Sequence, residues 1–353
     1  METFASDIIK EDLDFITQTS KSDLERICNS HLVLTGASGF IGKWLTLSYL
    51  HARRETGGNG RIVLVCRNIE PLRQLLDAFG FHEGFEFLEA DVRRFPEGVI
   101  KDSSLVIHAA TPASATLNTD DPLEMFDIIV AGQKKILEVC AKKKAVRVLF
   151  LSSGAIYGIQ PMDLVGFPEN WIGAPDITKS RNAYHEGKRV AEMMGFTYSK
   201  LNDFEFISAR LFAFLAPFLP LDEHFAAGNF VRDVVDGRKI VIKSGGGSIR
   251  SYLYATDMCR GLWSLLSRGV SGEAYNLGSE VEISILNLAK EVVRNTATDL
   301  GVSVLGVDTI ENVSRYVPDI SKIKNISGEI HTTSLELAIQ RTYRWARESR
   351  KNS

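Results

Sequence analysis

Short apolar runs alternate along this chain with longer segments in which apolar residues recur at helical spacing. Both faces of each run are apolar, which is typical of strands covered by helices on either side. The pattern predicts strands at residues 31–36, 61–66, 85–90, 104–110, 146–153 and 204–212. It predicts helices at residues 40–51, 70–79, 123–141 and 183–201. Strands that alternate with helices favour an α/β fold built on a doubly wound parallel sheet.

The two ends of the chain differ from this alternating region. Residues 1–30 place apolar positions at helical spacing among charges, which predicts one or two helices docked on the main domain or, alternatively, an arm that binds a partner. The expected sheet domain spans residues 31–212. Residues 213–353 are expected to form mainly a smaller lobe, with about 255–268 returning to the sheet domain.

Composition excludes several classes of protein. The 353 residues include 41 Lys and Arg against 44 Asp and Glu, a formal net charge of −3, so binding of nucleic acid by bulk electrostatics is not expected. The four cysteines are far apart, which argues against a disulfide framework or a zinc site. Neither a signal peptide nor an uncharged apolar stretch of the ~20 residues needed to span a membrane is present. We therefore expect a reduced, cytoplasmic protein with no membrane partner.

Glycines at spacing G-x-x-G-x-x-G join the first predicted strand to the first predicted helix. The segment reads Thr35-Gly-Ala-Ser-Gly-Phe-Ile-Gly42. In this context glycines permit a tight turn, close approach of a pyrophosphate and close helix packing, while the helix start offers free N–H groups. The alternative is a glycine-rich loop without a ligand. We predict a Rossmann dinucleotide site whose contacts come from Gly36, Ser38, Gly39, Phe40, Ile41 and Gly42.

Three further segments are expected to complete the cofactor site. Arg67 follows the second strand, where an acid would select NAD. A guanidinium suits a 2′-phosphate, so NADP is favoured over NAD unless Arg67 is only a solvated surface residue. Asp91 is positioned to bind adenine or, alternatively, to cap a turn. Ala109, Ala110 and Thr111 end the fourth strand on the same edge of the sheet.

A Y-x-x-x-K pair opens the predicted helix at 183–201. Tyr184 and Lys188 share a helix face, and an ammonium near a phenol favours the phenolate, so the pKa of Tyr184 is expected to be lowered toward operating pH. Such a phenol can exchange a proton with a sugar hydroxyl. Ser153 ends the fifth strand and can hydrogen-bond the same oxygen, although an isolated serine at this position would be interpreted as a strand-end cap.

These motifs together resemble the extended short-chain dehydrogenase/reductase family, in its nucleotide-sugar epimerase/dehydratase branch. The resemblance covers about residues 31–345 and includes TGASGFIG, LEADV, VIHAA, LSSGAIYG, YHEGK, IRSYLYATDM, YNLGS and YVPDISK. It implies that Ser153 is the catalytic Ser/Thr, Tyr184 the acid/base and Lys188 a ligand of the nicotinamide ribose.

The resemblance also implies a substrate and an assembly. It places Arg250 and Asn229 on the diphosphate of a nucleotide sugar, the alternative for Arg250 being a salt bridge between the lobes. It implies a homodimer formed through the helices at 123–141 and 183–201.

Departures from the family pattern narrow the expected reaction. Gly154 and Ala155 stand where dehydratases carry an Asp-Glu pair, and decarboxylases carry a Glu at the position of Ala155. Ala213 replaces an Asn, and residues 129–132 lack the Asn of an N-x-x-G segment. Redox at C4 of a nucleotide-activated hexose, by a 4-epimerase or a 4-keto reductase, is therefore expected. The alternatives are a dehydratase or decarboxylase with an atypical acid/base, and a non-catalytic dinucleotide-binding sensor.

Overall fold

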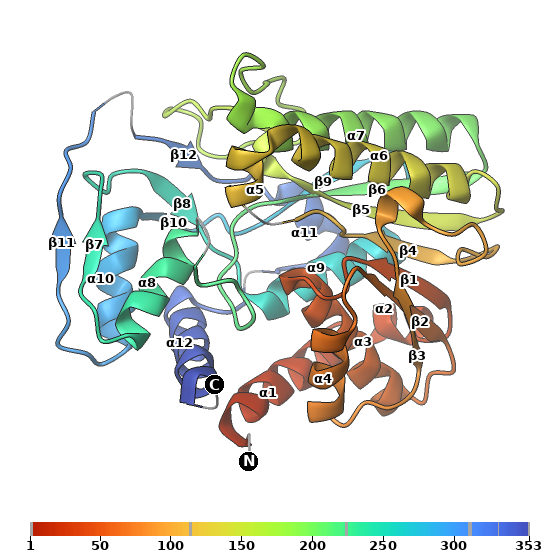
Figure 1. The fold of residues 1–353 in the computed structure, drawn as a ribbon, viewed down its shortest axis with the longest axis horizontal. Coiled ribbons are helices and arrows are strands. Elements are labelled where there is room, and N and C mark those ends of the chain that lie inside the picture. The colour runs from red at the N-terminus through yellow and green to blue at the C-terminus, as the bar shows by residue number, and fades with distance from the viewer. Residues whose placement is uncertain (1–2, 113–114, 223–224, 310–312, 331, 352–353) are drawn as a thin grey trace.

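A seven-stranded parallel sheet forms the centre of the molecule (Figure 1). The computed structural model describes residues 3–112, 115–222, 225–309, 313–330 and 332–351. The strands are β1 (His31–Thr35), β2 (Arg61–Cys66), β3 (Phe85–Glu89), β4 (Leu105–His108), β5 (Val146–Ser153), β6 (Phe204–Leu211) and β9 (Ala274–Leu277). Their order is β3-β2-β1-β4-β5-β6-β9, and all neighbours are parallel. This order is that of a doubly wound Rossmann sheet and confirms the expected fold class.

Helices cover both faces of the sheet because successive strand residues point to opposite sides. In β5, Leu149 and Leu151 enter one buried cluster, whereas Val148 and Phe150 enter the other. The helices that contribute to the first cluster include α3 (Phe40–Thr56), α4 (Glu70–Ala78) and α9 (Ala255–Arg268). The second cluster is completed by α6 (Pro122–Cys140) and α7 (Ala183–Leu201), which run side by side above the sheet in Figure 1.

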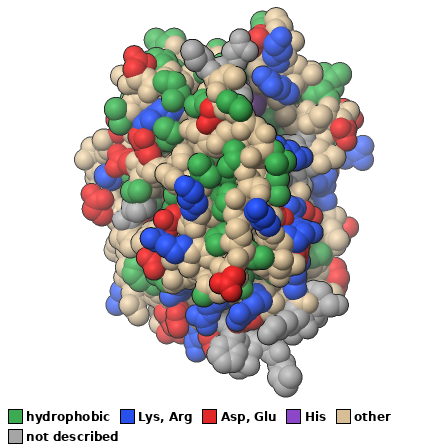
Figure 2. Space-filling view, turned by 90° about the vertical axis from the view of Figure 1, so that its left-hand side faces the viewer, with side chains coloured by type: hydrophobic (Ala, Val, Ile, Leu, Met, Phe, Trp, Pro, Cys, Tyr) green, Lys and Arg blue, Asp and Glu red, His purple; other side chains and the backbone are tan. Residues whose placement is uncertain are grey.

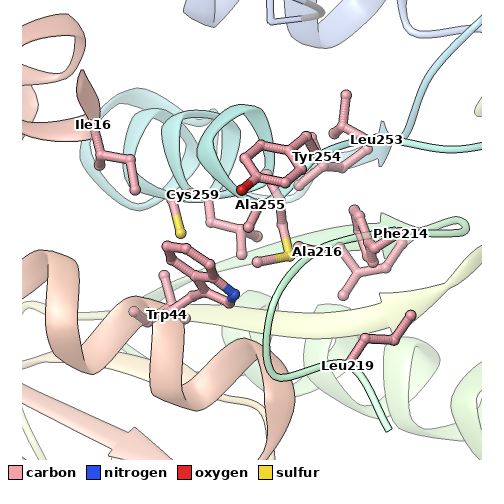
Figure 3. Packing of buried hydrophobic residues seen from close by; sticks show 14 of the residues in the cluster. Ile16, Trp44, Phe214, Ala216, Leu219, Leu253, Tyr254, Ala255 and Cys259 are labelled. Atoms are coloured by element: carbon pink, nitrogen blue, oxygen red, sulfur yellow. The ribbon is translucent and has the colours of Figure 1, made fainter. Parts of the chain in front are cut away.

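The N-terminal extension forms a layer of the folded core. Its helices are α1 (Thr3–Thr19) and α2 (Lys21–Ile27). Leu13 and Ile16 of α1 are buried in the first cluster, and Ile16 lies near Cys259 of α9 in Figure 3. Asp12 accepts hydrogen bonds from Tyr254 (2.6 Å) and from Arg341 (2.5 Å). The extension therefore packs on the main domain.

The smaller lobe is built from short strands and helices on one side of the sheet domain. Strands β10 (Glu282–Ser284), β8 (Ile249–Ser251) and β12 (Arg315–Tyr316) form one sheet, and β11 (Val302–Val304) pairs with β7 (Ile240–Ile242). Its helices include α8 (Ala226–Val235), α10 (Ile285–Asn295) and α12 (Leu335–Lys351), while α11 (Ser321–Ser327) lies against α9 and β9. On the outer side of this lobe, hydrophobic side chains gather between lysines and arginines (Figure 2).

Strand β9 departs from the expected division of the chain. From the sequence, some segments, at about residues 255–268, are expected to return from the smaller lobe to the sheet domain. Residues 274–277 also return, because β9 pairs with β6 from Ser208–Ala274 to Leu211–Leu277. Within the residues described, no helix combines the length and the apolar character that crossing a membrane requires.

Candidate active site

The turn between β1 and α3 has a backbone that only glycine accommodates. Gly36 has φ 73°, and a Cβ on it would lie 2.5 Å from the carbonyl oxygen of Ala109. A Cβ on Gly42 would lie 2.2 Å from the carbonyl oxygen of Gly36. Gly39 is the N-cap of α3 and supplies no side chain to the first-turn N–H groups. Those N–H groups and the helix dipole can therefore receive phosphate oxygens.

A cavity of about 270 Å³ opens beside this turn. Its lining contains every residue for which the sequence predicts a cofactor contact in the Rossmann domain outside α7: Gly36, Ser38, Gly39, Phe40, Ile41, Gly42, Arg67, Asp91, Ala109, Ala110 and Thr111. The glycine cradle and the open helix start fit the pyrophosphate of a dinucleotide such as NAD(P). These residues would hold that cofactor.

Arg67 and Asp91 differ in how freely they face this cavity. Arg67 is an exposed residue directly after β2. The carboxylate of Asp91 caps the short helix η1 (Val92–Arg94) through the N–H of Arg93 (2.9 Å) and also accepts three hydrogen bonds from the Arg93 guanidinium. The hydrogen bond from the Arg93 side chain is the largest of the effects that lower the pKa of Asp91. The structure thus gives Asp91 the capping role that the sequence left as an alternative, at a position on the cavity wall.

Ser153, Tyr184 and Lys188 meet in a second cavity of about 650 Å³. Ser153 lies at the carboxyl end of β5, while Tyr184 and Lys188 lie on the first turns of α7. Five residues line both cavities: Phe40, Ile41, Ala109, Thr111 and Pro112. The predicted catalytic side chains are therefore next to the predicted cofactor site.

Hydrogen bonds hold the start of α7 in place. The N–H of Tyr184 donates to Asn118 (3.1 Å), which lies on the short helix α5 (Ala115–Asp120) and donates in turn to the carbonyl of Arg181 (2.7 Å). The Lys188 ammonium donates to the carbonyl of Leu151 (2.6 Å) and to the hydroxyl of Thr111 (2.9 Å). Tyr184 is thus bonded to α5, and Lys188 is bonded to β5 and to the loop after β4.

Burial dominates the electrostatics of this cluster. It lowers the pKa of Lys188 to about 7, against the opposing effect of the Glu192 carboxylate. It raises the pKa of Tyr184, with a hydrogen bond to Ser153 as the opposing effect. The expectation of a lowered phenol pKa is therefore wrong for the protein alone. The physical reason is that desolvation of the phenolate exceeds the stabilisation it receives, and the Lys188 nitrogen lies 5.9 Å from the ring centroid.

Phe212 occupies the space beside Gly154, a position at which this chain departs from the family pattern. A Cβ on Gly154 would lie 2.5 Å from the Phe212 ring. Phe212 lines the second cavity and packs against Tyr316 with ring centroids 4.6 Å apart. A carboxylate side chain at position 154 would thus require this aromatic wall to move.

Arg250 and Asn229 have different positions relative to the second cavity. Arg250 lines it and donates to the carbonyl of Ser314 (3.1 Å) and to its hydroxyl (2.9 Å). Burial lowers the pKa of its guanidinium. Among the described residues no ion pair involves Arg250, so the lobe-to-lobe salt bridge is not formed there. Asn229 lies on α8 and does not belong to the cavity lining, although Ala226, one turn earlier, does.

Several site residues have no role predicted from the sequence. Asn118, Phe212 and Tyr316 line the second cavity. Tyr316 lies within the quoted segment YVPDISK, so its inclusion in that motif was the available signal. Neither Asn118 nor Phe212 belongs to a quoted motif, and only the fold brings them beside Tyr184 and Gly154.

Known proteins are similar to this chain in sequence. A family model described as the NAD dependent epimerase/dehydratase family matches residues 32–278. UDP-glucuronic acid decarboxylase 3 of Arabidopsis thaliana is 27% identical over 303 residues, covering 85% of this chain and 84% of the relative. UDP-glucuronic acid decarboxylase 1 of Xenopus tropicalis is 26% identical over 332 residues, covering 93% and 74%.

Solved structures of similar proteins share the fold. A dTDP-glucose 4,6-dehydratase of Streptomyces venezuelae, with NAD and TYD bound, has a TM-score of 0.77 at 21% identity and covers 91% of this chain and 98% of its own. A UDP-glucose 4-epimerase of Thermotoga maritima, with UDP-glucose, has a TM-score of 0.76 at 21% identity and covers 90% and 99%. Because the family model spans well over half of the sequence, the chain belongs to the NAD-dependent epimerase/dehydratase family and is an NAD(P)-dependent enzyme.

Proposed function

We propose that this enzyme carries out redox at C4 of a nucleotide-activated hexose, as a 4-epimerase or a 4-keto reductase. The observation that carries the proposal is the meeting of Ser153, Tyr184 and Lys188 in a cavity whose wall is shared with the glycine cradle. A serine, a phenol and an ammonium so placed are the groups needed to orient a sugar oxygen and exchange its proton.

Each side chain then has one role. When bound, NAD(P) would supply the hydride chemistry at a sugar carbon. Tyr184 exchanges the proton of the C4 hydroxyl, and Ser153 holds that oxygen. Lys188 holds the nicotinamide ribose and, when protonated, stabilises the phenolate of Tyr184. Burial raises the pKa of the Tyr184 phenol, and a positive charge nearby favours the phenolate.

The substrate end of the cavity fits an anion. Arg250 offers a guanidinium to the second cavity from the smaller lobe, and this suits the diphosphate of a nucleotide sugar. Asn229 is retained as a candidate second contact, because its Oδ1 is buried and makes no hydrogen bond with the described residues. Its position off the cavity wall makes it the weaker of the two.

Arg67 favours NADP over NAD. Its side chain lines the first cavity and lies just after β2, where a 2′-phosphate would be received. An Arg67→Ala variant should lose about tenfold in affinity for NADP with little change for NAD, since it removes a charge-assisted hydrogen bond. Equilibrium titration of both cofactors measures this, and equal losses for both would contradict the choice of NADP.

The relatives favour a second candidate, decarboxylation of UDP-glucuronic acid. This reaction is less well supported by the residues, because Ala155 offers no acid or base and Phe212 fills the space beside Gly154. Incubation with UDP-glucuronic acid and either cofactor tests it directly. Release of CO₂ with formation of a UDP-pentose would establish decarboxylation and overturn the first proposal.

The first proposal is tested with UDP- and dTDP-hexoses and with 4-keto derivatives. Net consumption of reduced cofactor, measured by absorbance, would identify a reductase. Inverted stereochemistry at C4 without net change in cofactor, measured by NMR, would identify an epimerase. Tight cofactor binding with no turnover of any of these substrates would instead favour the non-catalytic sensor.

A homodimer is part of the proposal. The helices α6 and α7 lie side by side on one face, and Met193 and Leu201 of α7 are 57% and 77% exposed. Packing of these helices against a second copy would cover such apolar side chains. Light scattering of the protein and of a Met193→Glu variant tests this, with a wild-type monomer as the contrary result.

A further inference from the structure

Thr111 connects the catalytic lysine to both halves of the site. Its hydroxyl accepts a hydrogen bond from the Lys188 ammonium at 2.9 Å. Thr111 comes from the loop after β4, whereas Lys188 comes from α7, 77 residues later. Thr111 also lines both the 270 Å³ cavity and the 650 Å³ cavity. It therefore stands at the junction where cofactor and sugar would meet.

The surroundings of Lys188 leave its ammonium few ways to replace water. The residue is 3% exposed. Its second acceptor is the carbonyl of Leu151, and its nitrogen lies 4.7 Å from the centroid of the Phe150 ring. A buried ammonium needs acceptors for its three protons, and each one lost carries the full cost of desolvation.

Other ionisable groups around Lys188 do not supply that acceptor. On the same helix, the charge of Glu192 raises the pKa of Lys188, and Tyr184 lies one turn before Lys188. From β4, His108 is buried, and its pKa is lowered to about 3 by burial and by the Lys188 charge. Glu192 is bonded by Arg210 and Ser208. Among the described residues, Thr111 is thus the side-chain acceptor of the Lys188 ammonium.

We propose that Thr111 is a positioning residue, which holds Lys188 in its charged form and aims it at the phenol of Tyr184 and at the ribose of the cofactor. This inference rests on the proposed function for the identity of the reaction. Its physical basis, the hydrogen bond between Lys188 and Thr111, does not depend on that function. The Thr111 hydroxyl accepts from the ammonium and keeps its own hydrogen to donate into the shared cavity. Valine has nearly the same shape and no such acceptor.

The decisive variants are Thr111→Val and Thr111→Ser. Loss of the acceptor should lower the pKa of Lys188 from its value near 7 by about one pH unit, since bonds to charged groups are the stronger ones. Serine keeps the hydroxyl and should restore the wild-type titration. Thr197→Val is the matched control, because the Thr197 hydroxyl donates to a carbonyl on the exposed side of the same helix (2.8 Å).

The titration of Lys188 is followed by ¹³C NMR of its Cε, assigned with a Lys188→Arg variant. A lower midpoint in Thr111→Val, with wild-type midpoints in Thr111→Ser and Thr197→Val, is the expected result. An unchanged midpoint in a folded Thr111→Val protein overturns the inference. So does a shift of the same size in Thr111→Ser, since serine retains the hydroxyl. The measurement needs no substrate and therefore stands apart from the identity of the reaction.

Kinetics give the second readout. In Thr111→Val, kcat should fall about tenfold and the high-pH limb of the rate profile should move to lower pH, while the affinity for UDP alone stays unchanged. Full activity of a Tyr184→Phe protein would overturn the acid/base role that the proposed function gives to Tyr184 and leave the NMR result intact. Loss of activity in Tyr184→Phe with no change in Thr111→Val would overturn only the role of Thr111.

Discussion

The cofactor side and the sugar side of the site are assembled in different ways. On the cofactor side, one turn of eight residues supplies the glycines, the helix start and much of the cavity lining. On the sugar side, the lining comes from the five residues shared with the cofactor side, from α5, α6 and α7, from the ends of β5 and β6 and from several segments of the smaller lobe. The cofactor side depends on backbone conformation, whereas the sugar side depends on which side chains come together. A local motif can therefore identify the first but not define the second.

The largest effect is expected where the two sides meet. A Tyr184→Phe variant removes the proton-exchanging hydroxyl, and loss of a general acid/base costs about 10²–10⁴-fold in rate. Turnover of the substrate identified by the panel measures it. Tyr198→Phe, on the same helix, is the control. Wild-type turnover in Tyr184→Phe would contradict the assignment of Tyr184 as the acid/base.

A smaller effect is expected on the cofactor side. In Gly42→Ala the new methyl would lie 2.2 Å from the Gly36 carbonyl oxygen, so the turn must shift. Overpacking of this kind costs about 1–3 kcal/mol, and we expect a tenfold or greater loss of NAD(P) affinity in equilibrium titrations. Gly98→Ala is the control, because a Cβ on Gly98 would meet no described atom within 4 Å. Undiminished cofactor binding in Gly42→Ala would show that side chains, rather than backbone, define this side.

The features that contiguous residues determine could be predicted from the sequence. The glycine turn, the Y-x-x-x-K pair and the six strands up to β6 are among them, because periodicity and turn chemistry are local properties. Strand β9 could not be predicted, since this short strand is recognised only through its pairing with β6. The contact of Phe212 with Gly154 and the bond between Lys188 and Thr111 join segments that are distant in sequence. The predicted pKa of Tyr184 was wrong because burial is not visible in a motif.

The sugar side is tested by Arg250→Met, which retains much of the apolar stem and removes the guanidinium. A bond from a charged donor contributes about 1.5–3 kcal/mol, so KM for the nucleotide sugar should rise about tenfold or more while kcat changes little. Cofactor affinity should be unaffected because Arg250 lies in the smaller lobe. Arg238→Met, at an exposed ion pair, serves as the control. Equal losses in cofactor and sugar binding would contradict the assignment of cofactor binding and sugar binding to different sides of the site.

The smallest expected effect concerns Asp12, which links the sheet domain to the smaller lobe. Asp12 of α1 binds Tyr254, which precedes α9 of the sheet domain, and Arg341 of α12 in the smaller lobe. Burial is the largest influence on its carboxyl and raises its pKa from 3.8 to about 7, against the effects of Arg341 and Tyr254. The folded protein thus holds this proton more tightly than the unfolded chain does. The contribution of Asp12 to stability is complete below about pH 4 and declines as the pH rises to about 7.

An Asp12→Asn variant has no proton to lose at this position. Its melting temperature should therefore lack the part of the decline between pH 4 and 7 that Asp12 causes in the wild type, a difference of a few degrees for a chain of this length. Calorimetry across that range measures it, with Glu83→Gln, at an exposed ion pair with Arg53, as the control that keeps the wild-type slope. Parallel profiles for Asp12→Asn and the wild type would mean that another group carries the pH dependence.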